Sequence, residues 1–192
     1  MDVATLHRGT VDHWMRAVEA IGPDDWTRAT PCAGWTVRDL VNHVTGEELW
    51  TVPLVQGATI ADVGDRFAGD VLGNDPVARA RAAAAAAVAA MDAEAAGGGG
   101  KVHLSYGDED IDEYALQLSA DHLVHGWDLA VAIGADTRMA PEHVVAVAGW
   151  FKDREELYRS GGAIGHRVAV TGDAQTELLA AFGRDARWAA PS

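Results

Sequence analysis

Residues 120–130 read ADHLVHGWDLA, and this stretch places four titratable side chains within about two turns of an otherwise apolar segment. They are Asp121, His122, His125 and Asp128. A polar group is costly to bury unless a hydrogen bond, an ion pair or a metal ion compensates it. The four side chains are therefore either solvated or committed to a partner, and the rest of the sequence has to decide between these two interpretations.

The segment belongs to one of several long helical patterns, which together predict a mainly α-helical protein built on a four-helix bundle. The bundle helices are predicted at residues 4–21, 36–50, 76–94 and 111–133. A fifth helix is expected over 141–160, then a turn and a strand within 161–174, and a final helix over 174–183. We expect residues 1–135 to form the bundle with a metal site, and residues 136–192 to form a short extension that packs on it as one structural unit.

Local signals mark the ends of several helices. Thr36 followed by Asp39 is typical of a capping box with the shorter acid. Pro76 and Pro141 suit the first position of a helix, and the glycines at 97–100 end the third helix. We expect a loop with a short helical turn over 52–74 and a short strand over 101–106. The acidic residues at 107–114 suit the start of the fourth helix, where the helix dipole favours negative charge.

The composition excludes several classes of function. The 29 acidic residues outnumber the 15 Lys and Arg, and the formal net charge of -14 disfavours binding to nucleic acid or to anionic membranes. The first residues lack the basic start and apolar run of a signal peptide, and the longest apolar run is alanine-rich and too short to span a bilayer. We therefore expect a cytoplasmic protein that acts on small molecules.

The spacing of Asp121 and His125 favours a metal site. Residues four apart on a helix project side by side, so this carboxylate and imidazole can converge on one point. On the second helix, His43 lies beside the apolar face, with Glu47 one turn further on. Facing helices assemble metal sites in bundle cores, and two histidines with one carboxylate leave a coordination position open, as in catalytic zinc and non-haem iron sites. We predict that His43, Asp121 and His125 bind a divalent metal ion.

Other interpretations of these residues stay open. Asp121 and His125 also suit a solvated or self-paired couple on the helix surface, and a hydrogen-bonded core network without a metal is a third reading. His122 is the main competitor as a ligand, and either His122 or Glu47 would close the site as a fourth ligand. Asp128 suits a role in orienting a ligand imidazole.

The remaining histidines and the lone cysteine give weaker evidence for a functional site. We expect surface or local roles for five histidines, two of them near an exposed chain start. They are His7, His13, His103, His143 and His166. Cys32, the one cysteine, excludes an internal disulfide and a multi-cysteine zinc site. It is a candidate nucleophile in a loop, although a small, partly buried packing residue is the simpler interpretation.

Two longer stretches carry a resemblance to a known family. They are PCAGWTVRDLVNHVTGEELW at 31–50 and DHLVHGWDLAVAIG at 121–134. Together they resemble the DinB-like metalloprotein superfamily, specifically the actinobacterial branch around the mycothiol-dependent maleylpyruvate isomerase N-terminal domain. The resemblance covers roughly residues 10–135, and LLAAFGRDARW at 178–188 is similar to the end of compact members of this branch.

The resemblance implies a metal site and a thiol co-substrate. In the family, a histidine of the W-T-V-x-D-L-x-x-H segment and an acid-x-x-x-His pair bind a divalent metal, usually zinc, and His43, Asp121 and His125 occupy those positions. The family often has Glu where this chain has Asp121. Nickel or iron are alternatives to zinc. The alanine- and arginine-rich composition suits an actinobacterial source, in which mycothiol is the available thiol.

Two functions follow as hypotheses. The first is a metal-dependent thiol transferase or isomerase that acts on a small electrophile, with Glu47 as the acid/base residue; Arg38 and Arg138 are weaker candidates for steering the substrate. We expect this protein to lack the longer C-terminal domain of the isomerase itself, so the activity of that isomerase is not carried over to it. The second is a non-catalytic module in which the bundle binds a metal or a small molecule. Exposed helix faces leave a homodimer open.

Overall fold

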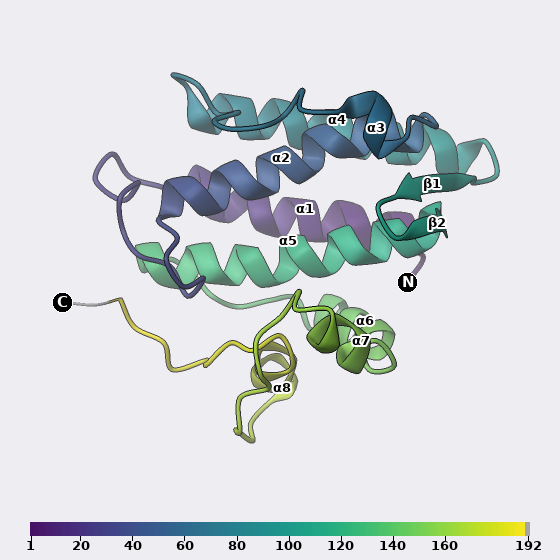
Figure 1. The fold of residues 1–192 in the computed structure, drawn as a ribbon. Helices are drawn as coiled ribbons and strands as arrows, with labels where there is room; N and C mark the ends of the chain where they lie inside the picture. The colour runs from purple at the N-terminus through teal and green to yellow at the C-terminus, as the bar shows by residue number, and fades with distance from the viewer. Residues whose placement is uncertain (191–192) are drawn as a thin grey trace.

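The computed structural model describes residues 1–190 and places four long helices side by side (Figure 1). They are α1 (Val3–Glu19), α2 (Val37–Val55), α4 (Pro76–Ala96) and α5 (Ile111–Ile133). Helix α1 packs against α5 and α4, and α2 packs against the same two helices. The predicted mainly α-helical bundle is confirmed, and α2 and α5 are neighbours although more than fifty residues separate them.

The predicted signals at the helix ends are present in the structure. At the start of α2, the Thr36 hydroxyl accepts a hydrogen bond from Asp39 N, and the Asp39 carboxylate accepts one from Thr36 N, so the capping box is complete. Pro76 begins α4 after the N-cap residue Asp75, and Gly97 ends that helix. Helix α2 runs past its predicted end through Pro53 to Val55.

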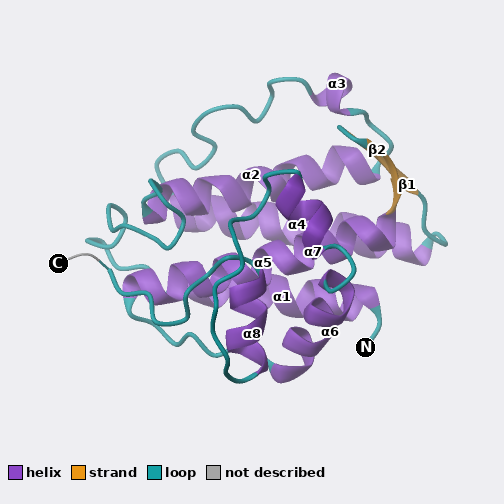
Figure 2. Ribbon diagram, turned by 60° about the horizontal axis from the view of Figure 1, so that its bottom comes forward, coloured by secondary structure: helices purple, strands orange, loops and turns teal. Residues whose placement is uncertain are grey.

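The strands form one short hairpin at the edge of the bundle (Figure 2). Strand β1 (Lys101–Leu104) pairs antiparallel with β2 (Gly107–Asp110). The helix predicted over 111–133 begins at Ile111, as expected, whereas β2 was not predicted: cross-strand hydrogen bonds to β1 hold these acidic residues extended just before the helix. The short helical turn expected within 52–74 is α3 (Ile60–Val63).

The C-terminal extension differs from its prediction in two respects. The helix expected over 141–160 is two helices, α6 (Pro141–Phe151) and α7 (Glu155–Ser160), and the last helix is α8 (Ala174–Ala181). Within 161–174 the structure has no strand. The valines there have β propensity but no neighbouring strand, and Val168 N instead donates to the carbonyl of Ala180.

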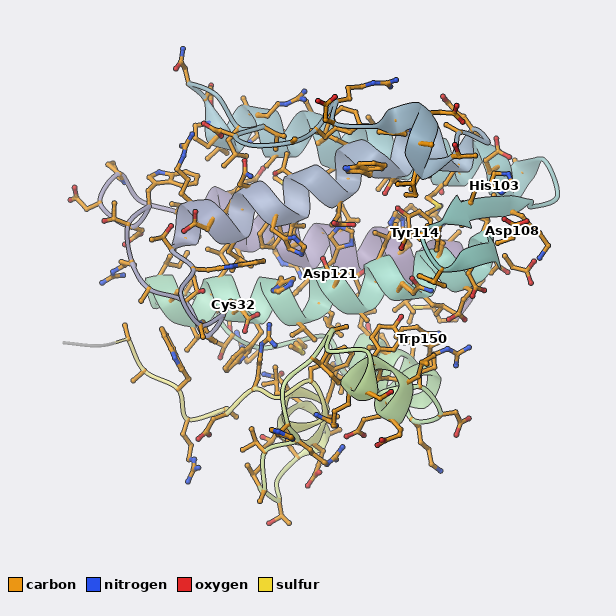
Figure 3. All side chains as sticks on the ribbon, in the orientation of Figure 1. Cys32, His103, Asp108, Tyr114, Asp121 and Trp150 are labelled. Atoms are coloured by element: carbon orange, nitrogen blue, oxygen red, sulfur yellow. The ribbon has the colours of Figure 1, made fainter. Side chains whose placement is uncertain are left out.

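One apolar cluster joins the extension to the bundle. It contains Leu123 and Trp127 of α5 together with Val147, Phe151 and Leu179 of the extension. Trp150 of α6 also donates its indole N–H to the Glu113 carboxylate of α5, and Figure 3 shows this ring next to α5. The extension therefore covers the face of α5 that points away from α4.

Two histidines expected at an exposed chain start are buried. The exposed fraction is 1% for His7 and 5% for His13, because α1 lies in the bundle over its whole length. His13 sits against Gly126 of α5, where an added Cβ would lie 2.5 Å from the His13 ring. The glycine lets α1 and α5 approach closely around this imidazole.

This burial predicts a pH dependence of stability. Burial lowers the pKa of His13 from 6.5 to about 4. Below pH 6.5 the unfolded chain binds a proton at this histidine that the folded chain does not, so the contribution is complete above that pH and is lost as pH falls toward 4. We expect the free energy of unfolding of the wild type to fall by about 2 kcal/mol more than that of His13→Gln between pH 7 and pH 5.

Urea unfolding of both proteins with a chelator present measures the difference. Comparing the two chains cancels the titration of all other groups that they share. A difference that stays constant with pH would show that His13 has the same pKa in the folded and unfolded chains, against the effect of burial.

Within residues 1–190, the structure contains no helix that combines the length and the hydropathy needed to cross a membrane.

Candidate metal centre

The structure brings His43, Asp121 and His125 together between α2 and α5. His125 Nε2 lies 3.3 Å from Asp121 Oδ1, and His43 Nε2 lies 3.9 Å from Asp121 Oδ2. One nitrogen or oxygen atom from each of the three residues lies within 4.8 Å of the other two. Figure 3 shows Asp121 on the side of α5 that faces α2. Their convergence agrees with the predicted ligand set, and their role as ligands stays a prediction.

The Asp121 carboxylate fits a bound cation. Its Oδ2 atom is buried and has no hydrogen-bond partner within the described chain, and its distance to His43 Nε2 is too long for a hydrogen bond. Ligand atoms held about 2 Å from a tetrahedral zinc ion lie roughly 3.3 Å apart, which is the observed distance between His125 Nε2 and Asp121 Oδ1, whereas His43 Nε2 lies somewhat further away at 3.9 Å. A divalent ion among these atoms would therefore satisfy a carboxylate oxygen that the protein leaves unsatisfied.

The charges around the three residues complement one another. Burial alone would raise the pKa of Asp121, but the imidazoles of His125 and His43 hold it well below its usual range. Burial alone would lower the pKa of His125, but the carboxylates of Asp121 and Asp128 raise it well above 6.5. Burial lowers the pKa of His43. Asp121 is therefore a carboxylate at neutral pH, the form that binds a metal.

His122, the competing ligand, points elsewhere. Its Nε2 atom lies 3.2 Å from Oε1 of Glu48, and both side chains are almost fully buried, at 1% and 0% exposure. The ring also packs edge-on against His7. His122 thus belongs to a polar pair within the core. Sequence reasoning missed Glu48, since its neighbour Glu47 was the acid expected to face the site.

Glu47 lies beside the three residues but faces a neighbouring cavity. That cavity of 380 Å³ is also lined by Trp50 and Tyr114. Burial, followed by the nearby negative charge of Asp121, raises the pKa of Glu47 to about 7. A carboxyl group with this pKa can both accept and release a proton near neutral pH.

A second cluster lies on the other side of His125. Its Nδ1 atom is 2.9 Å from Oδ2 of Asp128, which also accepts hydrogen bonds from the Arg184 guanidinium. The Cys32 thiol lies 3.3 Å from the same carboxylate. Cys32, His125 and Asp128 are close enough to hold a metal, but the positive charge of Arg184, 3.3 Å from the sulfur, opposes a cation there.

The loop before α2 and the extension supply the residues of this second cluster. Figure 3 shows Cys32 where that loop crosses α5. Sequence reasoning expected a packing role for Cys32 and did not consider Arg184. Hydrogen bonds between residues so distant in the chain leave no local pattern.

A cavity of 580 Å³ opens beside the predicted ligands. Its lining combines the three residues with the loop and the extension, including Trp35, Gln117, Tyr158, Phe182 and Arg184. The Trp35 ring lies 5.0 Å from the His43 ring. Arg38 and Arg138, the predicted steering residues, are instead exposed and paired with Asp70 and Asp136. Neither lines this cavity.

The fold and the site define a class: a helical bundle in which two facing helices present two histidines and a carboxylate to a cavity. The model of the family "mycothiol maleylpyruvate isomerase N-terminal domain" matches residues 7–130, and the chain belongs to that family. Comparison with curated proteins and with solved structures finds no match. The match covers all three predicted ligands and ends before Arg184.

Proposed function

We propose that the protein is a divalent-metal-dependent enzyme that joins a low-molecular-weight thiol, mycothiol, to a small electrophile, by transfer or as a step of isomerisation. The observation that carries the proposal is the set of three residues, His43, Asp121 and His125, next to a cavity large enough for a small molecule. Three protein ligands leave a coordination position for an exogenous group, whereas a structural site is closed by a fourth. His122 is engaged with Glu48, which supports an open site.

We propose zinc as the ion, because two histidines and one carboxylate form catalytic zinc sites; the same donor set also suits non-haem iron, and nickel is a further alternative. When bound, such an ion supplies a positive charge that favours the thiolate form of a thiol. His43, Asp121 and His125 would hold the ion, and Glu47, which faces the adjoining cavity and has a pKa of about 7, would take up the thiol proton. Trp35 and Phe182 line the cavity with apolar surface that excludes water from the reacting atoms.

The charges around the cavity favour an uncharged electrophile. The arginine that lines the cavity beside the predicted ligands, Arg184, is engaged in a salt bridge with Asp128. A substrate carboxylate would have to displace this bridge. A dicarboxylate substrate of the isomerase type therefore suits this cavity less well than a neutral one.

Monobromobimane, a neutral electrophile, tests the proposal with mycothiol as the thiol. The thiolate sulfur attacks the bromomethyl carbon, a C–S bond forms as the C–Br bond breaks, bromide leaves, and the thioether fluoresces. We expect the zinc-loaded protein to accelerate this reaction, and Glu47→Gln to lower the rate by about 10²-fold while mycothiol still binds. Because Glu47 acts as a base, the rate should fall below about pH 7 in the wild type and lose this dependence in the variant.

The same experiment distinguishes the alternative function. A protein that binds zinc but neither binds mycothiol nor accelerates the reaction is a non-catalytic metal-binding module. Loss of mycothiol binding on removal of zinc would support the open coordination position.

A further inference from the structure

We propose that Arg184 is a positioning residue of the metal centre: it fixes the Asp128 carboxylate, which in turn fixes the His125 imidazole with Nε2 directed at the metal position. This inference rests on the proposed metal site and extends it to a residue outside the family match, which ends at residue 130. It assigns the C-terminal extension a part in the centre that the bundle alone does not supply.

The contacts form a continuous chain from the extension to the predicted ligand. Arg184 donates from Nε to Asp128 Oδ1 at 3.0 Å and from Nη2 to Oδ2 at 2.8 Å, a two-point contact that fixes the plane of the carboxylate. Asp128 Oδ2 lies 2.9 Å from His125 Nδ1. The side chain of Asp128 is fully buried, and that of Arg184 is 17% exposed. Little solvent is present to replace either partner.

Two further contacts hold the Arg184 guanidinium in place. Its Nη1 donates to the carbonyl of Phe182, and its Nη2 also contacts the Cys32 sulfur at 3.3 Å. The guanidinium therefore joins three segments: the end of α8, the loop before α2, and α5. A side chain fixed at this many points can hold the carboxylate in one orientation.

The orientation of Asp128 determines what His125 can do. A carboxylate accepts hydrogen bonds only, so the imidazole donates its Nδ1–H to Asp128, and the lone pair that a metal would use is the one on Nε2, which is free once the Nε2 proton is released. Nε2 is the atom that lies 3.3 Å from Asp121. Carboxylates that hold a ligand histidine in this way typically change metal affinity by 10–100-fold when they are lost.

A second salt bridge provides a control that distinguishes positioning of the metal centre from simple attachment of the extension to the bundle. Arg154 makes a two-point contact with Glu113, with both nitrogen–oxygen distances at 2.8 Å, and it likewise connects the extension to α5. Neither partner contacts His43, Asp121 or His125 through a hydrogen bond or ion pair in the described chain. Arg154→Gln is therefore a matched control for Arg184→Gln.

The experiment measures zinc affinity by competition with a chromophoric chelator, and the unfolding of the metal-free protein, for the wild type, Arg184→Gln, Arg184→Lys and Arg154→Gln. We expect zinc affinity to fall by about 10–100-fold in Arg184→Gln, to recover in part in Arg184→Lys, and to change less than about 2-fold in Arg154→Gln. In the zinc-loaded wild type, the NMR signal of the His125 Nδ1–H should exchange slowly with solvent; it should broaden or vanish in Arg184→Gln only.

Unchanged zinc affinity in Arg184→Gln, or an equal loss in Arg154→Gln, would overturn the positioning role while leaving the metal site intact. A wild type that binds no zinc would instead refute the proposed function itself. If Arg184→Gln does not fold, Arg184→Lys decides the question: zinc affinity equal to that of the wild type, with the His125 signal also unchanged, shows that the two-point contact is not needed.

Discussion

Replacing His43 or His125 with alanine is expected to abolish stoichiometric metal binding. Each imidazole is one of three groups that converge between α2 and α5, and loss of one leaves two protein ligands for the ion. We expect about one zinc ion per wild-type chain by elemental analysis, and nearly none in either variant after dialysis, corresponding to a loss of affinity larger than the roughly 100-fold seen on removing an outer hydrogen-bond partner.

The control for this experiment is His103→Ala. The His103 side chain is exposed on β1, where it pairs with Asp108 and makes no ion pair with a predicted ligand in the described chain. It should keep its metal. Zinc should also raise the unfolding free energy of the wild type by about 1.4 kcal/mol for each tenfold excess over its dissociation constant, with no such effect in the two ligand variants. Metal-free wild type, or variants that retain zinc, would contradict the predicted ligand set.

Breaking the buried pair of Glu48 and His122 is expected to have the largest effect on stability. Their side chains are 0% and 1% exposed, and Nε2 of the histidine lies 3.2 Å from Oε1 of the glutamate. Burial raises the pKa of Glu48. Glu48→Leu leaves the imidazole buried without this partner, so the free energy of unfolding should fall by about 3 kcal/mol.

A double-mutant cycle checks the origin of this effect. Glu48→Leu combined with His122→Leu removes both polar groups, and much of the lost stability should return. Glu19→Ala, which breaks the exposed bridge to Arg81, should cost less than about 1 kcal/mol. All these variants should keep their zinc. Loss of zinc in His122→Leu would make His122 a ligand, and additive effects in the cycle would mean that the two groups do not interact.

The sequence predicted the long helices because their determinants are local. The capping box of Thr36 and Asp39, Pro76, and the glycines after residue 96 all act within a few residues of the helix end that they define. The hairpin was half predicted: β1 was expected, whereas β2 was not. Its acidic residues suit a helix dipole locally, and only pairing with β1 decides the outcome.

The candidate site was likewise predicted only in part. Asp121 and His125 share one helix face, and His43 stands beside the apolar face of its own helix, so their convergence followed from helical spacing and bundle packing. The contacts on the other side of His125 could not be predicted from helical spacing, because Cys32 and Arg184 are 152 residues apart in sequence. The burial of His7 and His13 was missed for a related reason: it depends on which helices cover α1.

The contact between Arg184 and Asp128 also orders events during protein synthesis. All three predicted ligands have been synthesised once His125 is added to the chain, whereas the arginine that holds Asp128 follows after the whole of α6, α7 and α8. At about 5–20 residues per second, the nascent chain spends several seconds with its ligands present and the Asp128 carboxylate without its guanidinium partner. If Arg184 positions His125 as proposed, the metal centre would be assembled in two stages, and the chain would reach its final affinity for metal only after α8 has been translated and has folded onto α5.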